Sequence, residues 1–114
     1  MARKIKTVDI VEAGTGDVFA DLGFADAGER KLKVQLAMRL NAVLTDEGLT
    51  QVKAAALFGI PQPHVSELAN YKLGRFSSER LLNFLTLLDR DVDILIRPKA
   101  RSHAHGQVSV LVAA

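Results

Sequence analysis

The chain of 114 residues contains no cysteine and no tryptophan, and only five phenylalanines and one tyrosine. Without cysteine, neither a disulfide framework nor a thiolate metal site can form. No apolar run approaches the roughly 20 residues that a membrane-spanning helix needs. The basic start, MARKIK, is followed by TVDIVEAG and not by a long apolar run, so it is not typical of a signal peptide. We therefore expect a cytoplasmic protein without a membrane partner.

The composition is that of an ordinary soluble domain, with 48% apolar and 25% charged residues. The length suits one domain with a single core and is too short for a catalytic cleft between two large layers. The charge is uneven along the chain: residues 1–49 carry seven basic and eight acidic side chains, whereas residues 50–114 carry eight and five. A basic excess in the second part favours a nucleic-acid partner.

Residues 50–75, TQVKAAALFGIPQPHVSELANYKLGR, contain two short helical patterns on either side of Gly59. Thr50 is typical of a helix N-cap, and Gly59 is typical of a helix end because glycine takes a positive φ without a Cβ penalty. Pro61 and Pro63 indicate the first turn of the next helix. The predicted inward faces are Val52, Ala55 and Ala56 in the first helix, and Val65, Leu68 and Ala69 in the second. This spacing predicts a helix-turn-helix.

The stretch resembles the helix-turn-helix of the Xre family of phage-repressor-type regulators. The resemblance rests on Thr50, Gln51, Ala54, Ala55, Gly59, Ile60, Gln62, Val65, Ser66 and Leu68. Two longer stretches, DVFADLGFADAGERKLKVQLAMRL before it and RFSSERLLNFLTLLDRDVDILIRP after it, resemble HigA-type antitoxins of toxin-antitoxin modules. The resemblance implies an operator-binding repressor and a toxin protein as a possible second partner.

The resemblance also implies roles for single residues. Gln51 would contact a phosphate at the start of the first helix, and Gln62 would read a base, because its amide can bond adenine N6 and N7 together. Pro63 stands where such regulators often have a second polar reader, and it offers only an apolar contact, for example to a thymine methyl. The other candidates are His64, Ser66 and Glu67 for bases or phosphates, and Lys53, Lys72 and Arg75 for phosphates. The alternative for all of them is an ordinary exposed helix face.

Further helices complete the predicted bundle. One begins at Asp26 and buries Leu32, Leu36, Leu40, Val43 and Leu44, which recur at steps of four and three. A closing helix follows Ser77 or Ser78 and buries Leu81, Leu82, Leu85 and Leu88. Nearer the N-terminus, residues 7–11 are predicted as a short strand, and the apolar patch at residues 18–24 as an extended segment or helical turn that packs on the bundle.

After Asp89 the period changes to an alternation of Val92, Ile94 and Ile96 that ends at Pro98, and a second apolar run covers residues 108–112. The two runs predict a two-stranded ribbon, which is marginal in water on its own. It would either pack on the bundle or pair with the same strand of a second chain and make a homodimer. The predicted fold is mainly α: a five-helix repressor-like bundle with a small C-terminal β ribbon. Its parts are an N-terminal extension (1–25), the DNA-binding domain (26–90) and a dimerisation segment (91–114).

Three patterns suggest other chemistry, and each has a simpler explanation. The glycines at 14 and 16 lack the third glycine and the Lys-Ser/Thr pair of a phosphate-binding loop, so a turn is favoured. His103 and His105 lack further ligands in their segment, so no metal is assigned. His64, Ser66 and Glu67 are the residue types of a hydrolytic triad, yet their side chains diverge within one helical turn. We therefore expect neither an enzyme nor a cofactor.

Two hypotheses of function follow. In the first, the chain is a sequence-specific, dimeric repressor that also neutralises a toxin and regulates its own operon. In the second, it is a protein-interaction module that binds a partner without reading DNA. The sequence leaves open the operator, the toxin and the surface that would bind it, and whether the strands or the bundle make the dimer.

Overall fold

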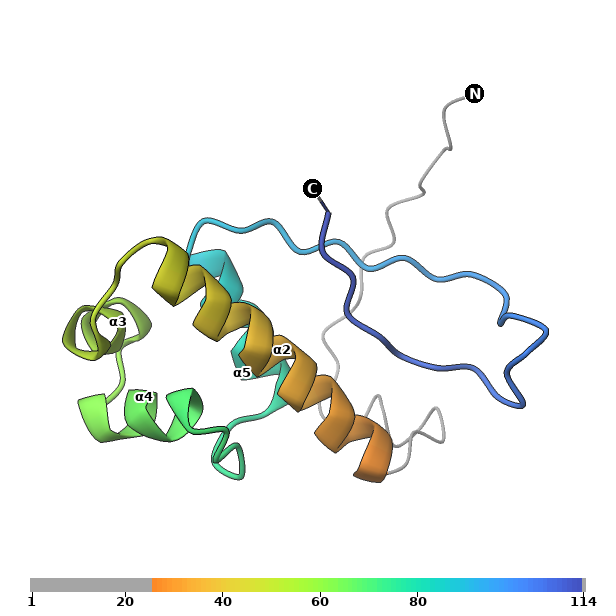
Figure 1. Cartoon of the computed structure of the whole chain (residues 1–114), viewed down its shortest axis with the longest axis horizontal. Helices are drawn as coiled ribbons and strands as arrows, with labels where there is room; N and C mark the ends of the chain where they lie inside the picture. The colour runs from red at the N-terminus through yellow and green to blue at the C-terminus, as the bar shows by residue number, and fades with distance from the viewer. Residues whose placement is uncertain (1–25, 114) are drawn as a thin grey trace.

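The computed structural model describes residues 26–113, which contain four helices. With the labels of Figure 1, these are α2 (Asp26–Asp46), α3 (Gln51–Phe58), α4 (Gln62–Ala69) and α5 (Ser78–Leu87). The strand predicted at residues 7–11 and the packing segment predicted at 18–24 lie outside the described residues. Within the described part of the chain, no helix is long and apolar enough to cross a membrane.

Helix α2 runs through the middle of the bundle and packs most extensively against α5 (Figure 1). Its five predicted core residues, Leu32, Leu36, Leu40, Val43 and Leu44, are all buried, which confirms the pattern of fours and threes. The chain leaves the helix through Gly48, whose φ is 64°. At this turn the Leu49 N–H donates to the Leu44 carbonyl at 2.9 Å and so satisfies one of the last carbonyls of the helix.

Helices α3 and α4 have the predicted bounds because their caps are encoded locally. The Thr50 hydroxyl accepts from the Lys53 N–H at 3.2 Å at the start of α3. At its end Gly59 has a φ of 71°, and its N–H donates to the Ala55 carbonyl at 2.9 Å. Pro61 is the N-cap residue of α4, and Pro63 lies in the first turn. The helix-turn-helix prediction is thus confirmed, with both ends of α3 and the start of α4 where the sequence predicts them.

The inward face of α3 differs from the prediction. Ala54, Ala55 and Phe58 are buried, whereas Val52 is 69% exposed and Ala56 is also exposed. Phe58 is the largest apolar side chain of α3, and residues three and four positions before it share its face. Burial of the phenyl ring therefore turns Ala54 and Ala55 inward and Val52 outward. In α4, Val65 and Leu68 are buried as predicted.

The prediction that Ala69 is buried is wrong, because this residue is exposed in the last turn of α4. A methyl group loses little by exposure there, and the helix gains nothing by turning further. The two larger apolar side chains therefore fix the orientation of α4.

Helix α5 closes the core. The Ser77 hydroxyl accepts from the Arg80 N–H at 3.1 Å, so Ser77 is the N-cap. Leu81, Leu85 and Leu88 are buried as predicted, while Leu82 is half-buried. Phe84, which is not among the predicted core residues, is 3% exposed, and its ring stacks on that of Phe58 with 4.3 Å between centroids. This pair joins α5 to α3, which carries half of the helix-turn-helix.

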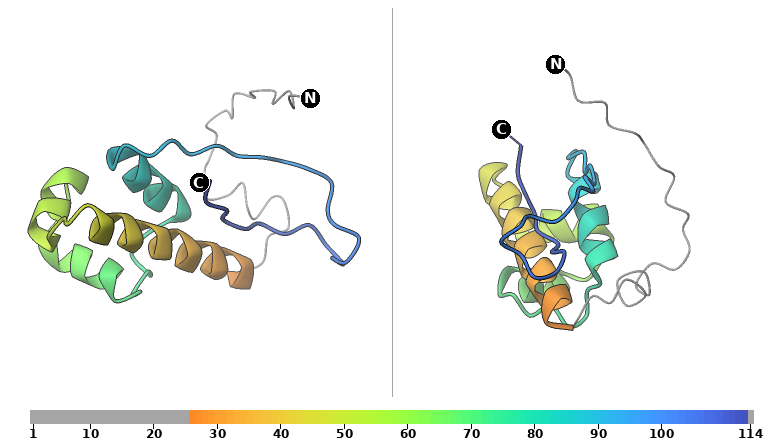
Figure 2. Two further views of the ribbon diagram at one scale, coloured as in Figure 1. Left: turned by 45° about the horizontal axis from the view of Figure 1, so that its top comes forward. Right: turned by 90° about the vertical axis from the view of Figure 1, so that its right-hand side faces the viewer.

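The predicted β ribbon is wrong for a single chain. Residues 91–113 contain no strand, and among the described residues no backbone hydrogen bond joins residues 91–99 to residues 107–113. Figures 1 and 2 show the tail leaving α5, running out as an extended arm, turning and coming back along a separate path. On the return, Val110 packs against the core and its N–H donates to Oε1 of Gln35 at 3.1 Å. Alternation predicted the extended backbone correctly, but it could not show that the two runs lie apart.

Candidate nucleic-acid interface

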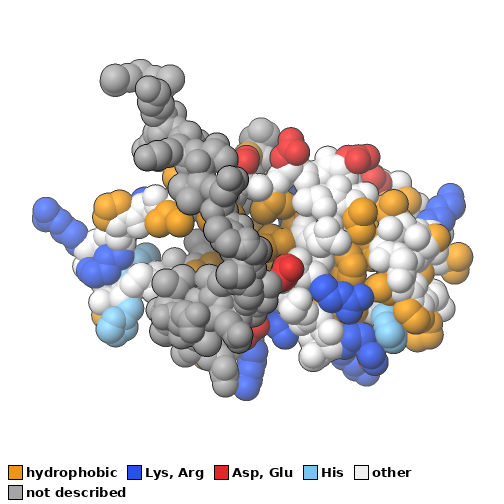
Figure 3. Space-filling view, turned by 180° about the vertical axis from the view of Figure 1, so that it is seen from behind, with side chains coloured by type: hydrophobic (Ala, Val, Ile, Leu, Met, Phe, Trp, Pro, Cys, Tyr) orange, Lys and Arg blue, Asp and Glu red, His pale blue; other side chains and the backbone are white. Residues whose placement is uncertain are grey.

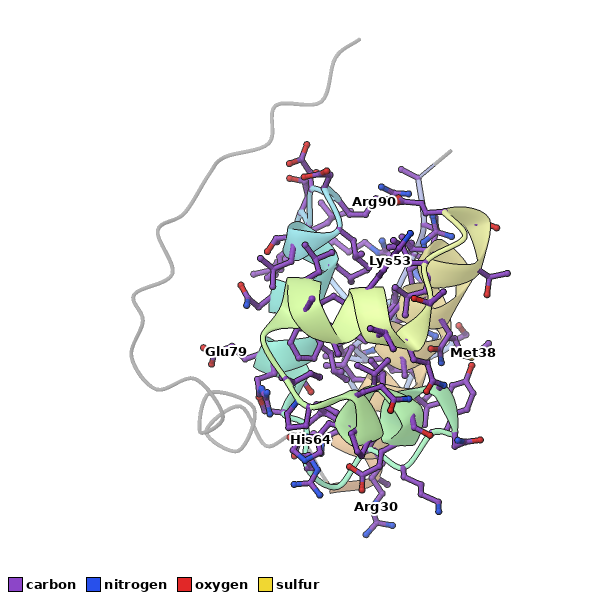
Figure 4. All side chains as sticks on the ribbon, turned by 90° about the vertical axis from the view of Figure 1, so that its left-hand side faces the viewer. Arg30, Met38, Lys53, His64, Glu79 and Arg90 are labelled. Carbon is purple, nitrogen blue, oxygen red and sulfur yellow. The ribbon has the colours of Figure 1, made fainter. Side chains whose placement is uncertain are left out.

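Helices α3 and α4 form one end of the molecule and are viewed face-on in Figure 4, where Lys53 projects from α3 and His64 from α4. The buried side chains Val65 and Leu68 hold α4 on the core. A polar contact also fixes it: Nδ2 of Asn41, on α2, donates to the Leu68 carbonyl at 3.3 Å. With α4 held in this way, Gln62 and Pro63 in its first turn are exposed.

The two glutamines of the predicted site contact each other. Nε2 of Gln62, at the start of α4, donates to Oε1 of Gln51, at the start of α3, with a distance of 2.7 Å. Both residues are exposed. The Gln62 amide therefore keeps one N–H and its carbonyl oxygen free, and the Gln51 amide keeps both of its N–H groups free. The contact restricts the rotamer of Gln62 without consuming the groups that a base would need.

The other predicted site residues differ in exposure. Lys53, Pro63 and Lys72 are exposed, whereas His64 and Ser66 are half-buried on α4. Figure 3 shows Lys and Arg side chains gathered beside a His side chain at the end of the molecule that carries α3 and α4. Positive charge therefore gathers at the end of the bundle that carries the helix-turn-helix.

Glu67 and Arg75 form an ion pair that the sequence analysis did not foresee. Nε of Arg75 donates to Oε1 of Glu67 at 2.6 Å, and Nη2 lies 3.5 Å from Oε2. The hydrogen bond from Arg75 lowers the pKa of the Glu67 carboxyl below its usual range, and the same contact raises the pKa of Arg75. The carboxylate is therefore held by a cation eight residues further on, after the chain has turned beyond α4.

Two further residues support this end of the molecule and were missed. Arg80 lies over the rings of Phe76 and Phe84, with its guanidinium carbon 5.4 and 5.5 Å from their centroids. Tyr71 has a φ of 60°, so the chain reverses directly after α4 at a residue other than glycine. A clue to Arg80 was its spacing, because Phe84 lies four residues further along α5 and residues at this spacing share one face of a helix. No local signal predicts the Tyr71 conformation.

In the described residues, no group of three His, Cys, Asp or Glu side chains could hold a metal ion. The pocket at this end is a shallow hollow of about 290 Å³ between the end of α2 and the helix-turn-helix. Beside this hollow, the exposed side chains of α3 and α4 present amides and a cation: Gln51, Lys53 and Gln62.

Comparisons with known proteins agree with this geometry. A family model described as a helix-turn-helix domain matches residues 18–97. A solved structure described as "Putative XRE Family Transcriptional Regulator" is 53% identical, and the match covers 78% of this chain and 100% of that one with a TM-score of 0.74. No curated protein matches the chain. The chain therefore belongs to the XRE family of helix-turn-helix transcriptional regulators.

Proposed function

We propose that the chain is a sequence-specific repressor that inserts α4 into the major groove of its operator. The observation that carries this proposal is the contact between Gln62 and Gln51 at 2.7 Å. It presents the Gln62 amide at the first turn of α4, the end of a recognition helix that meets base edges. The free carbonyl oxygen can accept from adenine N6 while the second N–H donates to N7.

Around this reader, each residue has a definite chemical task. Gln51 donates to a phosphate through its free N–H groups, and Lys53 and Lys72 meet phosphates as mobile cations. Pro63, beside Gln62 in the first turn, offers an apolar contact to a thymine methyl. His64 and Ser66 reach the groove from the next turn of α4. These residues combine sequence reading with charge-driven attachment to the backbone.

The ion pair supports a second role for Glu67 besides the base contact that the sequence suggested. Arg75 engages the carboxylate mainly at Oε1, at 2.6 Å, and so competes with cytosine N4 for it. In this second role Glu67 orients the Arg75 guanidinium, whose remaining N–H groups can contact a phosphate. The pair thereby also reduces the repulsion between the Glu67 charge and the DNA.

The test of base reading is Gln62→Ala on the DNA upstream of the protein's own gene. We expect specific binding to weaken by about 1 to 3 kcal/mol, while binding to random DNA hardly changes. Asn83→Ala is the matched control, because it removes an exposed amide from α5. Both affinities can be measured by fluorescence anisotropy at fixed salt. An equal loss on specific and random DNA would show that Gln62 contributes no base reading.

We further propose that the regulator acts as a two-fold dimer and as the antitoxin of a toxin-antitoxin module. One recognition helix reads too few base pairs to define a unique operator, and a dimer presents two helices to half-sites about one helical turn apart. The antitoxin role is supported by the resemblance of residues 17–40 and 75–98 to HigA-type antitoxins. The chain would then repress its own operon and bind the toxin encoded beside it.

The antitoxin role is tested by expressing the small reading frame next to the gene with and without this chain. Arrest of growth that the chain relieves, together with co-purification of the two products, is the expected result. If growth is arrested equally with and without the chain, the chain has no antitoxin activity. This test is independent of Gln62, so the Gln62→Ala variant should still relieve the arrest.

A further inference from the structure

The extended arm at residues 91–99 exposes apolar side chains beside a backbone that has no ladder partner in the described chain. Ile96 is 87% exposed, Ile94 is 60% and Leu95 is 48%. Among residues 26–113, the backbone N–H and carbonyl groups of residues 91–99 form no hydrogen bond to another segment. An exposed apolar edge of this kind is a template for pairing with another chain. The exposed edge therefore predicts a second strand that pairs with residues 91–99.

The charges on the arm indicate that the pairing strand is the same segment of a second copy. The sequence reads DVDILIRPK, and its charges reverse sign about Leu95: Asp91 and Asp93 precede it, and Arg97 and Lys99 follow it at the same distances. In a two-fold interface the same segment of both copies pairs with itself. Antiparallel pairing about Leu95 then places every acidic side chain opposite a basic one.

We propose that residues 91–99 of two copies pair as antiparallel strands with the two-fold axis at Leu95. This rests on the dimer of the proposed function and specifies its contacts. Asp93 lies opposite the partner's Arg97, and Asp91 opposite the partner's Lys99. On the other face, Ile94 lies opposite the partner's Ile96. Successive side chains of a strand alternate between faces, so the charged pairs flank the central Leu95 pair on one face, and the pairs of Ile94 with Ile96 lie on the other.

The position of Pro98 is compatible with this register. Opposed residues of antiparallel strands alternate between hydrogen-bonded and non-hydrogen-bonded pairs. When Leu95 and its copy form a hydrogen-bonded pair, the odd-numbered residues carry all ladder bonds. Pro98 then sits opposite Val92 in a non-hydrogen-bonded pair, where the missing N–H costs nothing. Its ring therefore does not interrupt the ladder.

The neighbouring registers are poorer. An axis at Ile94 places Asp93 opposite the partner's Leu95 and would pair Lys99 with Asp89, whose φ of 59° is not that of a strand. An axis at Ile96 places Leu95 opposite the partner's Arg97. Parallel pairing would bring Asp beside Asp and Arg beside Arg. The axis at Leu95 alone gives both acidic residues a basic partner and Leu95 an apolar one.

The bundle also anchors the arm at both ends, so the ribbon need not be stable alone. Nη2 of Arg90, just before the arm, pairs with Oε2 of Glu47 at 2.8 Å. Beyond the arm, the Val110 N–H donates to Gln35 at 3.1 Å. A free two-stranded ribbon is marginal in water, but this one would join two folded bundles.

The first test reverses single charges in the full-length chain. Asp93→Arg and Arg97→Asp each create two like-charge contacts in the dimer, and each should raise its dissociation constant about tenfold or more. The double variant Asp93→Arg/Arg97→Asp restores both charge pairs and should dimerise like wild type. An equimolar mixture of the two single variants should form the heterodimer, in which every residue 93 again lies opposite a residue 97 of opposite charge. Mass is measured by light scattering and native mass spectrometry without DNA, and circular dichroism verifies the helices. Single variants that dimerise like wild type, or a mixture without preferred heterodimers, would overturn the proposal.

The second test fixes the register in a chain that has no cysteine of its own. In the proposed ladder the Cα atoms of residue 94 and the partner's residue 96 are about 4.5 Å apart, a distance that a disulfide spans. An oxidised mixture of Ile94→Cys and Ile96→Cys chains should yield a cross-linked heterodimer, and neither variant should cross-link alone. Self-linking of Ile94→Cys or of Ile96→Cys would move the axis and refute the register.

Failure of the strand pairing can be distinguished from failure of the proposed function. If wild type is monomeric, or its dimer ignores these substitutions, the strand pairing is wrong whatever the DNA result. If the charge and cysteine tests succeed but Gln62→Ala loses specific and random DNA equally, the pairing stands and the proposed base reading falls.

Discussion

At the residue scale, the ion pair between Glu67 and Arg75 lowers the pKa of the Glu67 carboxyl. The hydrogen bond from Arg75 is the largest cause of the lowered pKa of Glu67, and the charge of Lys72 is the smallest. Arg75→Ala should therefore raise the pKa of Glu67 toward its ordinary value, as followed by NMR of the carboxyl carbon. Lys72→Ala is the matched control and should change it little. Equal pKa values in wild type and Arg75→Ala would contradict the pairing.

The direction of this shift also gives a pH dependence. The pKa of Glu67 is lower in the folded than in the unfolded chain, so the pair stabilises the fold above the unfolded pKa. That contribution is lost as the pH falls through the folded pKa. The stability difference between wild type and Arg75→Ala should accordingly be present at neutral pH and disappear in acid.

Single residues of the site were predictable where a helix position determines their role. Gln51 and Gln62 were found from their places at the starts of two helices, but their hydrogen bond depends on how those helices cross. Arg75 was read as a free phosphate contact because the turn that returns it to Glu67 includes the positive φ of Tyr71. Local sequence gives no account of that turn, so the ion pair required the structure.

At the scale of elements, the turn between α3 and α4 depends on Gly59. Its φ is 71°, and a Cβ added there would meet nothing within 4 Å. The cost of Gly59→Ala is therefore backbone strain alone, and we expect a loss of about 1 to 2 kcal/mol in the free energy of unfolding. Urea denaturation measures it.

Gly74→Ala is the control for this prediction. A Cβ at Gly74 also meets nothing within 4 Å, but Gly74 is not among the glycines with a positive φ. Its substitution should change stability by less than about 0.5 kcal/mol. Equal effects of the two substitutions would mean that the left-handed turn is not what Gly59 supplies.

The helix ends were the most predictable part of the fold. Thr50, Gly59, Pro61 and Ser77 act through contacts within four residues, so the sequence contains the whole cause. The orientation of α3 was less predictable, because a helix rich in alanine has little apolar contrast and the stacked pair of Phe58 and Phe84 decides it. The ribbon prediction was wrong for another reason: alternation indicates an extended backbone but does not indicate which strand pairs with it.

At the scale of the whole molecule, dimerisation should control operator binding. If each copy contributes one recognition helix, a monomer contacts about half of the phosphates that the dimer contacts. The slope of log K against log salt is proportional to the number of neutralised phosphates. A chain that cannot pair through residues 91–99 should thus bind the operator more weakly and with about half of the wild-type slope.

Asp93→Arg allows a stringent form of this experiment, because the substitution adds two units to the formal net charge of +2. Added positive charge by itself strengthens binding to DNA. A fall in operator affinity, with a slope near half of the wild-type value, is therefore opposite to the effect of the added charge and indicates loss of the dimer. Asp93→Arg/Arg97→Asp keeps the wild-type net charge and should recover both quantities. Titrations of the upstream DNA at several salt concentrations measure them, and an unchanged slope in Asp93→Arg would show that operator binding does not depend on the paired arms.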